Sequence, residues 1–87
     1  MRENKVNEIL EERLEQYGEA LNNFTTIGII WGALLQRSPI APHEVALMMD
    51  SFKTVRCFAN PFKEDSWNDK FGYTQHGVEI VKTYGSQ

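Results

Sequence analysis

The chain has 87 residues, of which 41% are hydrophobic and 24% are charged, and its formal net charge is −3. This length suits a single domain, and the composition is that of an ordinary globular protein. The negative charge argues against direct binding to DNA or RNA. The single cysteine, Cys57, excludes an internal disulfide and a cysteine-rich zinc site. The longest apolar run, residues 27–35, is about half as long as a membrane helix needs, so we expect no membrane span and a cytoplasmic location.

The first predicted helix covers residues 3–17. Apolar residues recur along it at helical spacing, and glutamates occupy the opposite side. Arg13 is an exception, because its angle places it within the apolar stripe. Gly18 is expected to end this helix as the residue after the C-cap, and Asn22 or Asn23 could cap the next helix.

The second predicted helix covers residues 23–36 and is apolar on most of its sides. Such a helix in a small protein is typical of the centre of a bundle or of an oligomer interface. Gly28 and Gly32 are four residues apart within it, and an interior glycine costs about 1 kcal/mol in helix stability. This spacing predicts that another backbone packs closely there. We expect Trp31 to lie in the core.

The third predicted helix covers residues 42–59, with Pro42 in its first turn and Glu44 near the positive end of its dipole. Asn60 and Pro61 are expected to end it. Lys53 flanks the apolar side of this helix, and Arg56 lies on it. That side is formed by Val45, Met48, Met49, Phe52, Val55 and Ala59.

The fourth predicted helix covers residues 66–83, after a capping residue that is either Asp65 or Ser66. One of its faces is apolar, and we expect Trp67 on this face to lie in the core. The face is formed by Trp67, Phe71, Thr74, Val78 and Val81. The fold prediction is therefore all-α, with residues 1–87 in one compact four-helix domain that assembles as a homo-oligomer.

Charged residues on apolar stripes lead to two alternatives. A buried arginine is costly unless it is paired, and its planar fork suits carboxylates and phosphates equally. Arg13 and Arg56 therefore either pair with Asp50, Asp65 or Asp69, or contact an anionic ligand.

Asp65 and Asp69 are one helical turn apart and project from the same side. Two carboxylates so placed could hold Mg²⁺ through water and a substrate phosphate, or could act only as a cap and an ion-pair partner. Tyr17 and Tyr73 each adjoin a glycine and could stack on a base at the edge of a cleft.

These features occur in an order that resembles a family of short phage and prophage proteins of unknown function. They are Glu12-Arg13, Tyr17-Gly18, Asn22 or Asn23, Trp31, Pro42 to Met49, Lys53-x-x-Arg56, Asn60-Pro61 and Asp65-x-Trp67-x-Asp69-x-x-Gly72-Tyr73. More distantly, the chain is similar to a nucleotide-modification-associated phage domain and to MazG-like nucleoside triphosphate pyrophosphatases, which are Mg²⁺-dependent helical oligomers.

The resemblance implies a site for a nucleotide or another phosphate ligand in the host cell cytoplasm. By position it points to Tyr17, Lys53, Arg56, Asp65 and Asp69, to which the charge and stacking arguments add Arg13 and Tyr73. MazG-like enzymes use a Glu-x-x-Glu pair followed by a Glu-x-x-Asp pair, and the chain has no Glu-x-x-Asp. We therefore favour binding over catalysis and leave open whether the chain is an enzyme. The alternative function is an inhibitor or sponge that acts on a host protein or a nucleotide defence signal.

Overall fold

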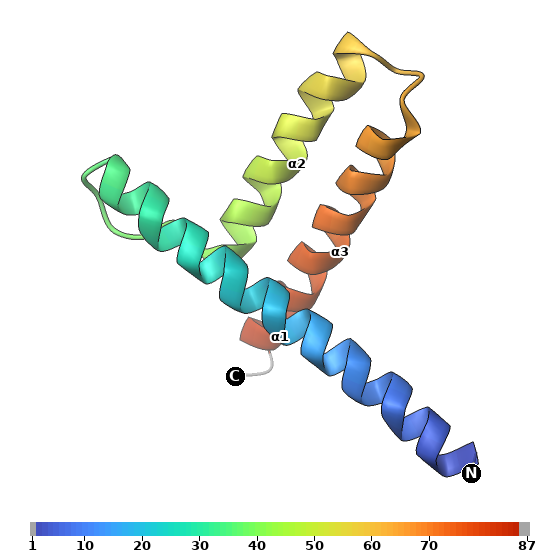
Figure 1. Cartoon of the computed structure of the whole chain (residues 1–87). Coiled ribbons are helices and arrows are strands. Elements are labelled where there is room, and N and C mark those ends of the chain that lie inside the picture. Colours follow the sequence, from blue (N-terminus) through green and yellow to red (C-terminus); the bar gives the residue numbers. More distant parts are fainter. Residues whose placement is uncertain (1, 86–87) are drawn as a thin grey trace.

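The computed structural model describes the backbone of residues 2–85 and the side chains of residues 18–84. It contains three helices, α1 (Arg2–Leu34), α2 (Pro42–Ala59) and α3 (Glu64–Gly85). Helices α2 and α3 run side by side as a hairpin, and α1 crosses the end of the hairpin opposite the α2–α3 connection (Figure 1). The all-α prediction is confirmed, while the four-helix count is wrong.

The first two predicted helices are one helix in the structure, because Gly18 does not end α1. The helix continues through this residue, and no glycine in the described chain has a positive φ. Leu21 and Phe24 follow on one face, and both pack in the hydrophobic core. Continuing the helix buries Phe24 and partly buries Leu21, and this burial outweighs the cost of about 1 kcal/mol of one interior glycine.

The end of α1 is a Schellman motif. Gln36 has φ 56° in the left-handed region. Its N–H donates to the carbonyl of Ala33 at 3.2 Å, and the N–H of Arg37 donates to the carbonyl of Gly32 at 2.9 Å. These two bonds satisfy helix-end carbonyls and turn the chain back toward α1.

The segment after this turn lies directly on the two glycines of α1. The N–H of Ile40 donates to the carbonyl of Gly28 at 3.0 Å. A Cβ added to Gly28 would meet the carbonyl oxygen of Ile40, and one added to Gly32 would lie 2.8 Å from the Cα of Pro39. The predicted close backbone approach at Gly28 and Gly32 is thus confirmed.

Helix α2 begins and ends as expected. Pro42 occupies the first turn, and the backbone N–H of Ala41 donates to Oε1 of Glu44 at 3.2 Å. At the other end the N–H of Asn60 donates to the carbonyl of Arg56 at 2.9 Å. The Asn60 side chain then accepts a hydrogen bond from the N–H of Phe62 at 3.3 Å, which shapes the turn into α3.

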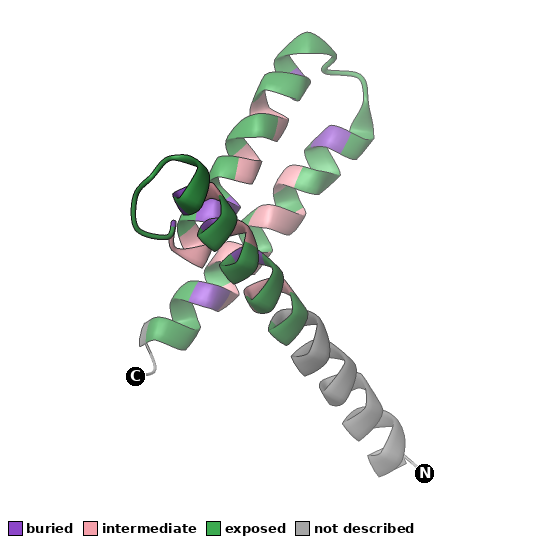
Figure 2. Cartoon of the chain, turned by 60° about the vertical axis from the view of Figure 1, so that its left-hand side comes forward, coloured by how far each residue is buried: buried purple, intermediate pink, exposed green. Residues whose placement is uncertain are grey.

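The core lies where α1 crosses the hairpin, and most of the surface beyond the crossing is exposed (Figure 2). The buried cluster consists of Phe24, Ile40, Val45, Ala46 and Ile80, with Leu21, Ile27, Trp31, Met49 and Tyr73 packed against it. The apolar faces predicted for α2 and α3 are only partly used: Val55 is 68% exposed and Trp67 is 51% exposed. The expected core position of Trp67 is therefore wrong, whereas Trp31 does pack on the core.

None of the helices in the described part of the chain combines the length and the apolar character that crossing a membrane requires.

Candidate functional site

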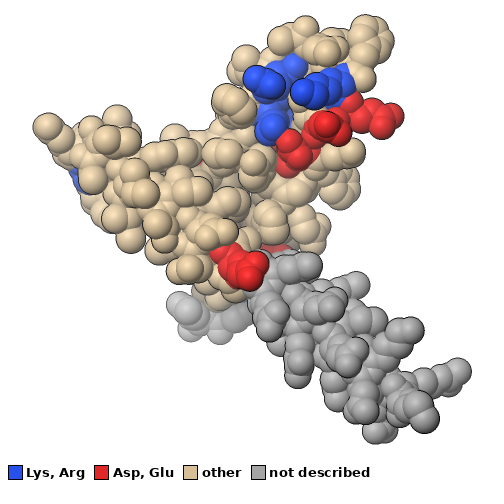
Figure 3. Space-filling model, viewed as in Figure 1, with Lys and Arg blue, Asp and Glu red and all other residues tan. Residues whose placement is uncertain are grey.

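Most of the predicted site residues lie near the α2–α3 connection, in a region that we call the hairpin tip (residues 52–69). Lysine and arginine side chains gather there, with acidic side chains beside them (Figure 3). Lys53 Nζ lies 2.7 Å from Asp69 Oδ2, which joins α2 to α3. The Lys53 side chain is 19% exposed and that of Asp69 is 46% exposed, so the pair is open to water on its acidic side.

Arg56 is an exposed cation of the hairpin tip, as is Lys63. Arg56 lies in the last turn of α2, where its positive charge interacts favourably with the negative end of the helix dipole. Its guanidinium carbon lies 5.9 Å from the centre of the Phe52 ring. Among the described residues no carboxylate lies within 4.0 Å of it. The alternative in which Arg56 pairs with an aspartate is thus not seen in this part of the chain, and Asp50 and Asp69 bind lysines instead.

The two predicted Mg²⁺ ligands do not form a cation site by themselves. Asp65 is exposed in the first turn of α3, and Asp69 is already paired with Lys53. The described residues contain no group of three or more histidine, cysteine or acidic side chains that could hold a metal ion. A divalent cation at Asp69 would have to displace the lysine, so a Mg²⁺ site here stays a prediction that the described geometry does not favour.

The remaining predicted ligand residues are not gathered at the hairpin tip. Tyr73 is half-buried, and its ring centre lies 6.3 Å from that of Phe24 in the core. The side chains of Arg13 and Tyr17 lie outside the described residues. The structure therefore brings together Lys53 and Asp69 from the predicted set. Tyr73 lies one helical turn after Asp69 on α3, with its ring near Phe24.

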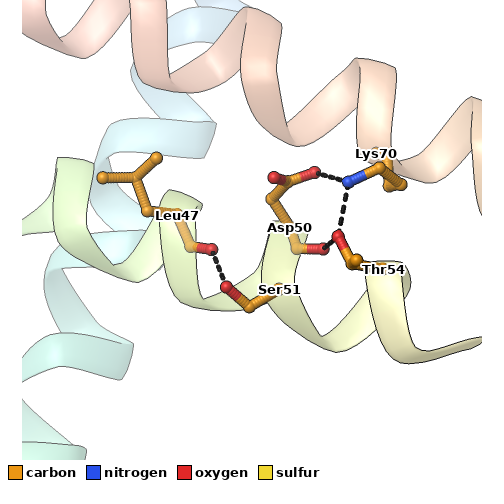
Figure 4. Close-up of polar contacts among 5 residues, drawn as sticks. All are labelled: Leu47, Asp50, Ser51, Thr54 and Lys70. Carbon is orange, nitrogen blue, oxygen red and sulfur yellow. Dashed lines mark hydrogen bonds and ion pairs between the residues drawn. The ribbon is translucent and has the colours of Figure 1, made fainter.

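A second polar cluster, which sequence reasoning missed, joins the middle of the two hairpin helices (Figure 4). Lys70 Nζ donates to Asp50 Oδ1 at 2.7 Å and to Thr54 Oγ1 at 2.6 Å. The sequence did contain a signal for it. An acid precedes a base on α2 (Asp50, Lys53), and an acid also precedes a base on α3 (Asp69, Lys70). In an antiparallel helix pair, this order places opposite charges across the interface at two levels.

The hairpin tip also exposes aromatic rings. Phe58 is 87% exposed and Phe62 is 92% exposed. Trp67 is fixed by a hydrogen bond from Nε1 to the carbonyl of Pro61 at 2.9 Å. A hollow of about 290 Å³ lies beside Phe58 and Trp67, and buried Cys57 forms part of its lining.

Two histidines lie away from the tip. His43 stacks edge-on against Tyr84 at 5.9 Å, and His76 stacks edge-on against Phe24 at 5.8 Å. The Nδ1 atom of each is buried without a hydrogen-bond partner among the described residues. Each ring therefore contributes mainly apolar contact to the packing of α1, α2 and α3.

Comparison with known proteins places this chain beside phage proteins. A family model described as a domain of unknown function, DUF6378, matches residues 3–81. The Gene 55 protein of Mycobacterium phage L5 is 34% identical over 62 residues, which are 71% of this chain and 40% of that protein. The chain thus spans about 40% of the length of this relative. No solved structure matches the chain. The resemblance to phage proteins of unknown function is confirmed, while neither match concerns MazG-like or nucleotide-modification proteins.

Proposed function

The chain belongs to the DUF6378 family, and we propose that it works by binding a phosphate-bearing ligand of the nucleotide type at the hairpin tip. The observation that supports this proposal is the setting of Arg56. Its exposed guanidinium stands over the Phe52 ring, and no described carboxylate neutralises it.

An arginine fork binds phosphate oxygens through two parallel hydrogen bonds, which makes it a specific anchor. The exposed rings of Phe58 and Phe62 supply apolar planes near the same end of α2, and aromatic planes of this kind stack on bases. Lys53 contributes a second cation if a ligand phosphate replaces Asp69 as its partner. The proposed ligand therefore combines a phosphate with a flat, apolar base.

The proposal is one of binding and includes no catalytic step. Asp69 is occupied by Lys53, and Asp65 alone offers a divalent cation too few ligands. Nucleotide hydrolysis would need a cation or a base that the described residues do not assemble. If Mg²⁺ takes part, we expect it to arrive bound to the ligand phosphates.

A thermal-shift screen followed by calorimetry tests the proposal. Nucleoside triphosphates and cyclic oligonucleotides are added with and without Mg²⁺, and a ligand at 100 times its Kd adds about 2.7 kcal/mol of stability. We expect Arg56→Ala to weaken binding by roughly 10- to 100-fold, because a charge-assisted hydrogen bond is worth about 1.5–3 kcal/mol.

Arg37→Ala is the matched control for charge. Arg37 is an exposed arginine in the α1–α2 loop, and this loop lies far from the hairpin tip (Figure 1). Its replacement should leave the affinity unchanged. Equal affinity of the Arg56→Ala variant and the wild-type chain would refute the proposed anchor, and the absence of any shift would refute nucleotide binding.

A second candidate function is inhibition of a host protein through the same tip. Phe58, Phe62 and Trp67 are exposed there beside a cation, and protein-interaction hot spots are enriched in large aromatic residues and arginine. Under this reading, Phe62→Ala abolishes a stable complex with a host protein while nucleotides have no effect on thermal stability.

We also propose that copies of the chain associate with one another. The buried core is small, and long apolar side chains on all three helices remain exposed. Association would cover part of this surface, as is common for small helical proteins.

A further inference from the structure

The outer face of α3 has the pattern of a coiled-coil seam that no part of the described chain covers. Trp67, Phe71, Thr74, Val78 and Val81 follow one another at intervals of four and three residues. This is the spacing of a heptad seam. Phe71 is 77% exposed and Val81 is 52% exposed, although a seam of this kind is stable only when a second helix packs on it.

A long groove runs beside this seam between α2 and α3. It is formed by three hollows of about 370, 320 and 290 Å³. The first and second share Asp50 and Thr74, and the second and third share Trp67 and Lys70. The groove therefore follows the hairpin from the level of Val81 to that of Pro61, and its shape suits a helix.

The chain as a whole is more extended than a compact domain of its size. The chain has an accessible surface of 6962 Å², whereas a compact protein of its mass has about 5,300 Å². Its radius of gyration is 15.6 Å, compared with about 12 Å for a compact domain of this length. The extended helix α1 contributes part of this excess (Figure 1), and the exposed seam of α3 contributes another part.

The polar side chains at the base of the groove are already paired with one another, so a packed helix could cover them. Lys70 already bonds to both Asp50 and Thr54, so its charge has a partner before any other helix arrives. Burying a charge is costly chiefly when it is left unpaired. The cluster can therefore lie beneath a packed helix without an isolated ion.

We propose that a second copy of this chain occupies the groove, with the two α3 helices antiparallel about a two-fold axis. This proposal gives a place and a geometry to the self-association proposed above. Phe71 faces the partner subunit's Val81, and Thr74 faces the partner subunit's Val78. The antiparallel direction sets each Phe71 against a valine of the other copy, and the two central layers hold the small side chains of Thr74 and Val78.

The alternatives pack less well. In a parallel pair, Trp67 and Phe71 meet their own copies at one end, and valines meet at the other end. An antiparallel register shifted by one heptad sets Val81 against Glu64 of the partner subunit, which places a carboxylate on an apolar layer. Of these two antiparallel registers, the proposed one keeps charged residues out of the seam.

The molar mass in solution tests the interface. We expect the wild-type chain to have twice the 10.1 kDa of one copy and Phe71→Glu to have the mass of one copy with its helical circular dichroism retained. Phe62→Glu, at a position that is 92% exposed outside the seam, is the control and should stay dimeric. A monomeric wild-type chain refutes self-association altogether, whereas a dimeric Phe71→Glu refutes only this seam.

Disulfide trapping tests the direction of the helices in a Cys57→Ser background. Chains with Phe71→Cys mixed with chains carrying Val81→Cys should form a mixed disulfide. Val81→Cys chains alone should not, because their residues lie about 15 Å apart along the axis, beyond the reach of a disulfide. Efficient trapping of Val81→Cys with itself would show a parallel pair and overturn the proposal, as would the absence of the mixed disulfide.

Discussion

Replacing Gly28 by alanine is the most decisive perturbation of the fold. The new methyl group would meet the carbonyl oxygen of Ile40 and would lie 3.1 Å from its carbonyl carbon. This backbone cannot retreat freely, because Ile40 donates its N–H to the Gly28 carbonyl at 3.0 Å and its side chain is 7% exposed in the core.

The expected loss follows from three opposing effects. Alanine gains about 1 kcal/mol of helix propensity over glycine. Moving Ile40 away costs about 1–3 kcal/mol for the broken buried hydrogen bond and part of the roughly 1.5–3 kcal/mol gained by burying an isoleucine. We expect a net destabilisation of about 2–4 kcal/mol, which lowers the melting temperature by roughly 8–25 °C in a domain of this size.

The assay is thermal and urea unfolding followed by far-ultraviolet circular dichroism, with both variants at one protein concentration because self-association would shift the transition. Gly18→Ala is the matched control, since nothing described lies within 4 Å of a Cβ there. It should stabilise the chain by about 1 kcal/mol. If Gly28→Ala is as stable as Gly18→Ala, the close contact of the loop with α1 is not what makes glycine necessary.

Three further substitutions test the turn and the half-buried polar cluster. Gln36→Gly should stabilise the chain by about 1 kcal/mol, because φ 56° strains a residue with a side chain but not glycine; a loss of stability in urea unfolding would count against the assigned turn. Lys70→Met should cost about 1–2 kcal/mol, because it leaves the half-buried carboxylate of Asp50 without its cation and Thr54 without its donor. Lys53→Met should cost less in the same assay, since its partner is more exposed, and an equal or larger cost would contradict this order.

The parts of the fold that were predictable from sequence are those set by local chemistry. Pro42 and Glu44 mark the start of α2, and Asn60 marks its end, because capping depends on a few neighbouring residues. The glycines of α1 were also informative, since an interior glycine in a helix needs a packing reason.

The length of α1 was not predictable in this way. Glycine is typical of the position after a helix end, and only the packing of Leu21 on the core shows why the helix continues through Gly18. Local preference is weak, and tertiary contacts decide such cases.

The apolar faces show a different limit. Periodicity correctly grouped Phe71 with Val78 and Val81, but it does not reveal what covers a face. The expectation of an intramolecular core failed for Trp67 because one copy of the chain has too few helices to cover both sides of the hairpin.

The candidate site was predictable as a region and not as a set of contacts. Lys53 and Asp69 do meet, yet they neutralise each other instead of leaving a cation and a carboxylate for a ligand. Lys70 was missed because its partners Asp50 and Thr54 lie on another helix, and only the antiparallel alignment of the hairpin brings them together.

The buried thiol of Cys57 can serve as a chemical probe of local opening in the hairpin. This residue carries the only thiol in the chain, and its side chain is 6% exposed beneath the hairpin tip. The sulfur is largely shielded, so the rate of its reaction with an alkylating reagent should rise with the fraction of time that α2 and α3 are parted at the tip. Because nothing else in the sequence reacts in this way, opening at the tip can be followed in the unaltered chain, with no label that disturbs the packing.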